Sequence, residues 1–306
     1  MTRLQSESEA EAEAATFSAQ GQGPTKGPGD ENFPVASKLI PARFRHTILA
    51  FYRFVRLADD IADAPDLAPE TKTAWLEALD TALERGRADD AAPPPPGLDA
   101  AVIACAYRTR KIFDDAGLTP LHARHLLQAF RQDATKGRYR DWNELLTYCR
   151  YSAAPVGRML FDVHGEDKSG WPASEALCAS LQILNHLQDC KSDYQELDRV
   201  YLPEPWFRDE GITVDALAAP QASAELRRVL DRTLEGVQRL NGQAQPLIGH
   251  IRHISLRIEA AIIVSIAELL AAKLGRCDPI ARRVELSWFE RLRAGVKGLV
   301  RGLAAR

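Results

Sequence analysis

The amino-acid sequence predicts an all-α protein, a bundle of long helices. Apolar residues recur at intervals of three and four along most of the chain, which is the pattern of amphipathic helices. Runs in which apolar and polar residues alternate one by one between turns are nearly absent, so strands are not expected. Short connections join the helical segments and no repeat of fixed period occurs, which favours a packed bundle over a repeat array.

The first part of the chain differs in composition from the rest. Residues 1–30 are rich in Glu, Ala, Gln and Gly and poor in aromatic side chains. Such a segment buries too little apolar surface to offset the entropy lost on folding, so it is predicted to be a disordered acidic tail. Residues 31–306 are long enough to bury a large core and are predicted to form a single helical domain.

Prolines and glycines set the expected bounds of the helices. Pro41 precedes a first helix that runs to about Ala64, and Pro69 opens a second helix that ends near Arg87. Four consecutive prolines within residues 89–97 indicate a surface loop. The remaining helices are expected at residues 98–116, 120–134, 141–163, 173–197, 214–242, 246–275 and 279–303.

Charge, cysteines and hydropathy narrow the classes of function. The net charge is −3, so a nucleic-acid partner is not expected. The five cysteines include no CxxC pair, which argues against a structural zinc site and a disulfide framework and suits a reducing cytoplasm. The N-terminus lacks the features of a secretory signal, and the most apolar stretch, residues 258–274, contains three charged residues. That stretch is predicted to be a buried core helix, and the protein to be cytoplasmic.

The first candidate functional segment is a polar stripe on a largely apolar helix. Tyr52, Arg56, Asp59 and Asp63 are spaced by four, three and four residues, so they share one helix face. Burying two carboxylates without compensation costs several kcal/mol per ion. The stripe is therefore predicted to serve a function, although a solvated helix face is the usual explanation of one such acidic pair alone.

A second segment repeats the arrangement. Gln182, Asn185, Asp189 and Asp193 are spaced by three, four and four residues on another helix with apolar neighbours. All of these side chains offer oxygen atoms, which are the ligands that Mg²⁺ prefers. The two stripes together predict a magnesium site that binds a diphosphate and stabilises charge as that group departs.

These motifs resemble those of the squalene/phytoene synthase family. That family carries Asp-x-x-x-Asp on each of two helices, with Tyr and Arg before the first motif and Gln-x-x-Asn before the second. Residues 198–203 (Asp-Arg-Val-Tyr-Leu-Pro) and residues 148–157 are similar to two further segments of the family. The resemblance covers about residues 31–290. It implies an isoprenoid-synthase-type helical bundle around a central apolar cavity.

The resemblance also implies roles for particular residues. The four aspartates are expected to be catalytic, and the implied ligands of Mg²⁺ are Asp59, Asp63, Asn185, Asp189 and Asp193. The implied contacts to the substrate are Tyr52, Arg56, Gln182, Asn185, Arg199 and Tyr201. Asp133 and Lys136, near the end of a predicted helix, are added as accessory contacts to diphosphate or metal, with a solvated helix end as the alternative.

Within the family, residues 31–37, 129–136, 152–157 and 185–190 are most similar to hydroxysqualene synthases of the HpnC type, from bacterial hopanoid pathways. Gln188 stands where the family commonly has an arginine. Losing that arginine weakens the grip on one diphosphate, which an enzyme that does not join two farnesyl diphosphates tolerates. The resemblance therefore implies conversion of presqualene diphosphate and water to hydroxysqualene and diphosphate, with Mg²⁺ and without NADPH.

Three alternatives stay open at this point. The first is condensation of two farnesyl diphosphates to presqualene diphosphate or squalene. The second is a terpene cyclase or a head-to-tail prenyl synthase, because residues 59–63 also fit the pattern Asp-Asp-x-x-Asp. The third is a non-catalytic assembly factor, a role that some relatives lacking the aspartates have taken; the presence of all four aspartates argues against it.

The C-terminal segment suggests a further partner. Residues 282–306 contain seven Arg or Lys against two Glu, and apolar residues from Phe289 to Leu303 recur at helical spacing. This is a basic amphipathic helix, compatible with peripheral contact with the inner face of the cell membrane; packing against its own bundle is the alternative. The resemblance also implies functional coupling to the enzymes that act before and after this one in squalene formation.

Overall fold

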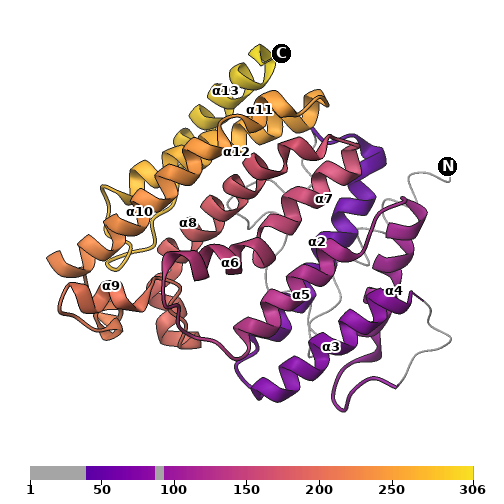
Figure 1. Cartoon of the computed structure of the whole chain (residues 1–306), viewed down its shortest axis with the longest axis horizontal. Helices are drawn as coiled ribbons and strands as arrows, with labels where there is room; N and C mark the ends of the chain where they lie inside the picture. Colours follow the sequence, from indigo (N-terminus) through magenta and orange to yellow (C-terminus); the bar gives the residue numbers. More distant parts are fainter. Residues whose placement is uncertain (1–38, 87–92, 306) are drawn as a thin grey trace. The chain divides into compact units, whose positions relative to one another are not determined.

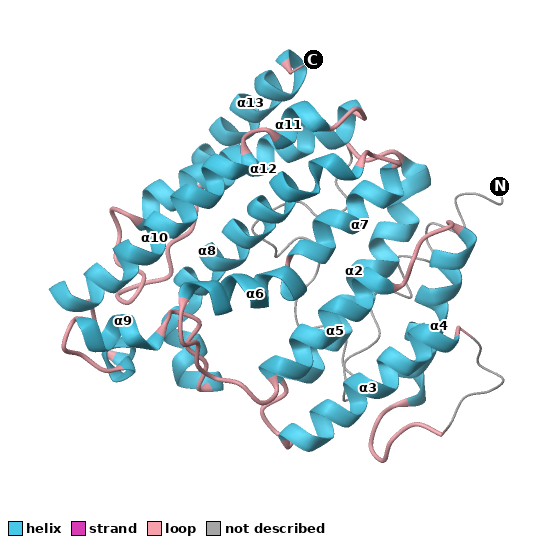
Figure 2. Ribbon diagram, viewed as in Figure 1, coloured by secondary structure: helices cyan, strands magenta, loops and turns pink. Residues whose placement is uncertain are grey.

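The computed structural model describes residues 39–86 and 93–305. Apart from one isolated bridge between Arg138 and Val200, the regular elements in these ranges are helices, which confirms the all-α class (Figures 1 and 2). The tail predicted for residues 1–30 lies outside the described residues, as do residues 31–37 and the start of the proline loop. The helices fall into two compact units, which are described in turn. The single domain over residues 31–306 stays a prediction.

The first unit holds four helices, at the positions that the sequence predicts. Phe51 and Phe113 pack their rings 6.2 Å apart in its core, and Phe54 and Ile61 are fully buried beside them on the first helix. This apolar face anchors the helix that carries the first aspartate motif. The helices are α2 (Ala42–Asp63), α3 (Pro69–Arg85), α4 (Ala100–Asp115) and α5 (Leu121–Asp133).

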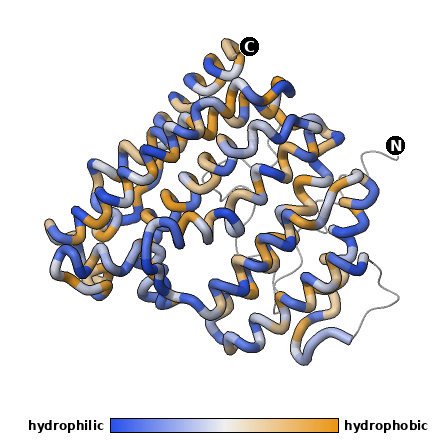
Figure 3. Tube along the Cα trace, viewed as in Figure 1, coloured by the Kyte–Doolittle hydropathy of each residue, from blue (hydrophilic) through white to orange (hydrophobic). Residues whose placement is uncertain are grey.

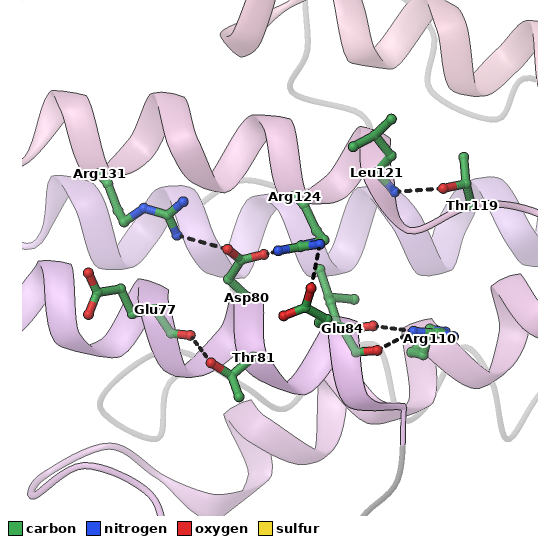
Figure 4. Close-up of polar contacts among 10 residues, drawn as sticks. Glu77, Asp80, Thr81, Glu84, Arg110, Thr119, Leu121, Arg124 and Arg131 are labelled. Carbon is green, nitrogen blue, oxygen red and sulfur yellow. Dashed lines mark hydrogen bonds and ion pairs between the residues drawn. The ribbon is translucent and has the colours of Figure 1, made fainter.

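Ion pairs fix α5 against α3. Asp80 of α3 accepts hydrogen bonds from Arg124 at 2.6 Å and from Arg131 at 3.5 Å, and Arg124 also pairs with Glu84 at 3.1 Å (Figure 4). These pairs are partly exposed, so each contributes at most about 1 kcal/mol to stability. They set the register of α5 and thereby the position of Asp133 at its end.

The second unit is built around α8, its longest helix, which packs against α7, α10 and α12. Its helices are α6 (Trp142–Ser152), α7 (Ala154–His164), η2 (Lys168–Gly170), α8 (Trp171–Leu197), α9 (Glu204–Asp209), η3 (Val214–Ala218), α10 (Ala224–Ala244), α11 (Leu247–His250), α12 (Ile254–Leu274) and α13 (Trp288–Ala304). The short helix α9 was not predicted. α12 is mostly buried, as expected of its apolar sequence. None of the helices within the described residues has the length and apolar character that crossing a membrane requires.

Glycine allows α7 to approach α8 closely. A Cβ atom on Gly157 would lie 2.9 Å from Sγ of Cys178 and would also collide with the Ser174 hydroxyl. The two helices therefore meet with the side chains of α8 directly against the backbone of α7.

Two predicted long helices are each interrupted, and those predictions are wrong. The helix expected over 141–163 breaks at Ala153, because Pro155 cannot donate the hydrogen bond that a continuous helix needs there. The helix expected over 214–242 is a short 3₁₀ helix followed by α10, whose first turn is capped by the Ser223 hydroxyl.

The helix predicted over 246–275 is also interrupted, by a buried carboxylate. Glu166 accepts hydrogen bonds from the backbone N–H groups of Arg252 at 2.9 Å and His253 at 2.6 Å. Both residues lie just before α12, and His253 is the N-cap residue, whose N–H has no partner within the helix. The capping contact from a distant part of the chain separates α11 from α12.

The last predicted helix, 279–303, begins nine residues late. Residues 279–282 form turns and a bend, and residues 283–287 have no regular structure; the Gln188 side chain of α8 donates to the carbonyl oxygen of Val284 at 2.6 Å. Ser287 and Glu290 then form a capping box that starts α13 at Trp288.

Small residues join α13 to α12. The buried residues of α13 are Ala294, Gly298 and Gly302. A Cβ atom on Gly298 would lie 2.5 Å from the backbone nitrogen of Ile262, and one on Gly302 would lie 2.8 Å from a backbone carbon of α12. Figure 3 shows that apolar and polar residues are interspersed along the helices. At this contact, glycines bring α13 directly against the backbone of α12.

This close contact predicts a stability difference between two glycine variants of α13. Gly298→Ala is expected to have a free energy of unfolding about 1–3 kcal/mol lower than Gly295→Ala, because its added methyl group meets the backbone of α12. Gly295 is the matched control, since nothing lies within 4 Å of a Cβ placed there and the gain in helix propensity is the same. Urea unfolding followed by circular dichroism measures both, and equal stabilities would contradict the close packing.

Candidate active site

The polar stripe of α2 is held together by one guanidinium group. Arg56 donates to Asp59 at 2.5 Å and to Asp60 at 2.9 Å, one helical turn away. The side chain of Asp60 is only 8% exposed. Tyr52 and Asp63 lie half-buried on the same face. Asp60 was absent from the predicted site residues, although its position beside Asp59 in the sequence was the available signal.

Carboxylates crowd around Asp59. Its pKa is raised to about 8, first by burial and then by the negative charge of Asp63, with Asp60 and Asp133 adding to the effect. The positive charge of Arg56 opposes this rise. Asp133 comes from α5 and is itself buried. Several carboxylates of this unit thus lie close to one another, which is an environment that suits a bound cation.

The second stripe runs along α8. Gln182, Asn185, Asp189 and Asp193 are all half-buried on one face, as the spacing predicts. Asp189 accepts two hydrogen bonds from Arg283, from Nε to Oδ1 at 2.6 Å and from Nη2 to Oδ2 at 3.0 Å. This bidentate arrangement fixes the orientation of the carboxylate.

Arg283 was not predicted, and the residue that places it is Gln188. The amide of Gln188 is buried and donates to the carbonyl oxygen of Val284, the residue after Arg283. Lys191 also donates to the carbonyl oxygen of Ile280, at 3.3 Å. The glutamine that stands in the place of an arginine therefore anchors a segment that brings another arginine to the same motif. No local sequence signal links residues so far apart along the chain.

Residues 198–203, which follow α8, are held by a distant strand-like segment. The N–H of Val200 donates to the carbonyl oxygen of Gly137 at 2.8 Å, and Arg138 pairs with Asp198 at 2.5 Å. A side chain on Gly137 would collide with the Asp198 carbonyl. This pairing fixes the predicted contact residues Arg199 and Tyr201, both of which are buried.

Tyr201 belongs to an aromatic cluster. It stacks on His186 of α8 with ring centroids 3.5 Å apart, and on Tyr139 and Tyr148 at 5.6 and 5.5 Å. Burial and, to a smaller extent, the nearby charge of Arg199 together lower the pKa of His186 to about 3. His186 is therefore neutral at physiological pH. Lys136 lies 4.6 Å from the centre of the Tyr139 ring and pairs with Glu144 at 2.8 Å.

Comparison with known proteins places the chain in a family. A profile of squalene/phytoene synthase matches residues 27–290. The chain belongs to the squalene/phytoene synthase family. It is 41% identical to the hydroxysqualene synthase of Sinorhizobium fredii over 90% of both chains, and 43% identical to that of Rhodopseudomonas palustris over 85% of both. It is also 30% identical to the phytoene synthase of Thermus thermophilus over 85% of this chain and 84% of that one.

Solved structures of the family agree with the fold. A crystal structure of the squalene synthase HpnC from Alicyclobacillus acidocaldarius is similar with a TM-score of 0.67 and 28% identity, covering 79% of this chain and 87% of that one. A dehydrosqualene synthase, at 20% identity and a TM-score of 0.69, supports the fold alone and covers 88% and 90%. The predicted family, enzyme class and helical fold are confirmed. The roles of the individual site residues and the apolar cavity stay predictions.

The residues on the two helices fit the magnesium that the family implies. The implied ligands offer only oxygen atoms, as a hard cation requires, and burial together with the charge of Asp63 raises the pKa of Asp59. Across residues 39–86 and 93–305, no three acidic, His or Cys side chains converge into a ready metal cage. Mg²⁺ commonly binds through one or two carboxylates together with water and substrate phosphates, so such a cage is not needed.

The anchoring role of Gln188 gives a test. Gln188→Leu is expected to lower the free energy of unfolding by about 1–3 kcal/mol, because the carbonyl of Val284 loses its buried donor. Backbone amides of residues 280–286 should also exchange their hydrogens faster. Gln195→Leu changes an exposed glutamine of the same helix and should alter neither quantity. Unchanged exchange in Gln188→Leu would show that other contacts hold the segment.

Proposed function

We propose that this chain converts presqualene diphosphate and water to hydroxysqualene and diphosphate. The observation that carries the proposal is the pattern of identity within the family. Three relatives named hydroxysqualene synthase are 38–43% identical to this chain, over 85–90% of both chains. The phytoene synthases compared are 26–31% identical.

In the proposed reaction the bond between carbon and the diphosphate oxygen breaks, and its electron pair leaves with the diphosphate. The cyclopropylcarbinyl cation rearranges, a water oxygen bonds to the new cationic carbon, and a proton is released. Carbon is neither oxidised nor reduced overall, so NADPH is not required. An apolar cavity would hold the hydrocarbon and limit the access of water.

We assign the binding of Mg²⁺ and of the departing diphosphate to the two polar stripes. When Mg²⁺ is bound, the charge that develops on the leaving diphosphate is neutralised. The proposed ligands, which are also the residues whose loss should stop catalysis, are Asp59, Asp63, Asn185, Asp189 and Asp193. The oxygen chemistry of this set and the crowding of charge around Asp59 support the assignment.

The proposed contacts to the substrate comprise cations, neutral hydrogen-bonding groups and one carboxylate. Arg56, Lys136 and Arg199 supply positive charge to the diphosphate. The others are Tyr52, Asp133, Gln182, Asn185 and Tyr201. To these we add Arg283, whose guanidinium lies against Asp189 where the family commonly places an arginine at position 188.

This function places the chain between two other reactions. An enzyme that joins two farnesyl diphosphates must supply its substrate, and an enzyme that reduces an allylic alcohol must act on its product before squalene is formed. The proposed location is the cytoplasm.

A second candidate is the condensation of two farnesyl diphosphates. It is favoured by the similarity to a crystal structure named squalene synthase HpnC, which is 28% identical. The identities of 38–43% to hydroxysqualene synthases outweigh it.

Substitution of one aspartate from each stripe tests the metal assignment. Asp59→Asn and Asp189→Asn should each lower kcat with presqualene diphosphate by at least about a hundredfold, because charge on the leaving group is no longer stabilised. Asp115→Asn, an exposed aspartate paired with Lys111, is the control and should keep the wild-type rate. Removal of Mg²⁺ with a chelator should stop the wild-type reaction, and added Mg²⁺ should restore it. Wild-type rates in both aspartate variants would refute the assignment.

Isotope labelling tests the reaction itself. Incubation of presqualene diphosphate in ¹⁸O-labelled water should yield hydroxysqualene that carries one ¹⁸O atom, as measured by mass spectrometry. Farnesyl diphosphate alone should yield no product. Squalene or presqualene diphosphate formed from farnesyl diphosphate would support the second candidate instead.

A further inference from the structure

Helix α13 exposes an apolar face. Among the described residues, ten large apolar side chains are strongly exposed, and seven of them belong to this helix. Phe289 is 76% exposed and Trp288 is 67% exposed. The other five are Leu292, Val296, Leu299, Val300 and Leu303. A contiguous apolar surface of this kind usually marks a binding surface.

The packing of α13 determines where this face points. Residues 288, 292, 296, 299 and 303 are spaced by three and four, so they form one stripe. Ala294, Gly298 and Gly302 form a separate stripe, against the backbone of α12. Rotating α13 would move large side chains into a contact that admits no Cβ atom. The apolar face is therefore held away from α12.

Positive charges border the apolar face. α13 contains four Arg or Lys and one Glu. Lys297 and Arg301 pair with Glu268 of α12 at 2.7 and 3.2 Å, while Arg293 lines a shallow pocket of about 320 Å³ between the two helices. Lys297 keeps 56% of its side chain exposed in spite of its pair. An apolar stripe flanked by cations is the pattern of helices that lie in the surface of an anionic bilayer.

The apolar face of α13 lies near the end of the chain. The match to the squalene/phytoene synthase profile ends at residue 290, so nearly all of α13 lies beyond it.

We propose that α13 docks this protein on a membrane surface that contains anionic lipids. The helix lies parallel to the bilayer, with Trp288, Phe289 and Leu292 among the acyl chains and Arg293 and Lys297 at the phosphate groups. Pairing of α13 with a second copy of the chain is disfavoured, because it brings the positive charges of two helices together. The proposal does not rest on the reaction assigned above.

Vesicle binding by the full-length protein tests the proposal. The wild type should sediment with vesicles that contain phosphatidylglycerol, and less with vesicles of phosphatidylcholine alone or at high salt. The double variant Leu292→Glu/Val296→Glu should bind at least about tenfold more weakly, since two apolar side chains no longer enter the bilayer. Because both residues are exposed, the thermal unfolding transition should be unchanged.

Two controls make the outcome decisive. Leu121→Glu introduces the same change at a residue of similar exposure outside α13, and should bind as the wild type does. Brominated lipid should quench part of the tryptophan fluorescence, and that part should be absent in Trp288→Phe. Absence of vesicle binding, or equal binding by the double variant, would overturn the proposal. So would a dimer of the wild type, seen by sedimentation velocity without vesicle binding, that the double variant abolishes.

Discussion

The first unit depends on one physical constraint, which is the partial burial of several carboxylates that lie close together. Asp59, Asp60, Asp63 and Asp133 lie close enough for the others to raise the pKa of Asp59, while Arg56 offsets part of their charge. Such an arrangement persists only because the apolar face of α2 is buried and α5 is held in register by α3. The packing of these helices holds the carboxylates close to one another.

In the second unit, a carboxylate of the acidic motif pairs with an arginine from a distant part of the chain. Asp189 accepts two hydrogen bonds from Arg283, which follows α12. The amide of Gln188 holds the segment that contains this arginine. The replacement of arginine by glutamine therefore changes more than the charge at one position.

The sequence pattern predicted those features that depend only on residues close together in the chain. The positions of α2, α3, α4 and α5, and the two acidic stripes, follow from the helical period, and the structure has them where the pattern predicts. The interruptions at Ala153 and before α12 depend on a proline effect and on a carboxylate, Glu166, from a distant part of the chain. The contact of Arg283 with Asp189 likewise joins residues 94 positions apart, which no periodicity reveals. For α13 the sequence offered two alternatives, packing on its own bundle or peripheral contact with a membrane, and the second stays a prediction. The structure shows that small residues provide the first, while large apolar residues of this helix are exposed.

The close packing of α7 against α8 at Gly157 affects how the protein can be labelled chemically. Burial raises the pKa of the Cys178 thiol to about 11, so it is protonated at neutral pH. Alkylating and oxidising reagents react with the thiolate, and this sulfur also lies directly against the α7 backbone. The half-buried Cys178 thiol should therefore react more slowly with such reagents than a cysteine introduced on the surface.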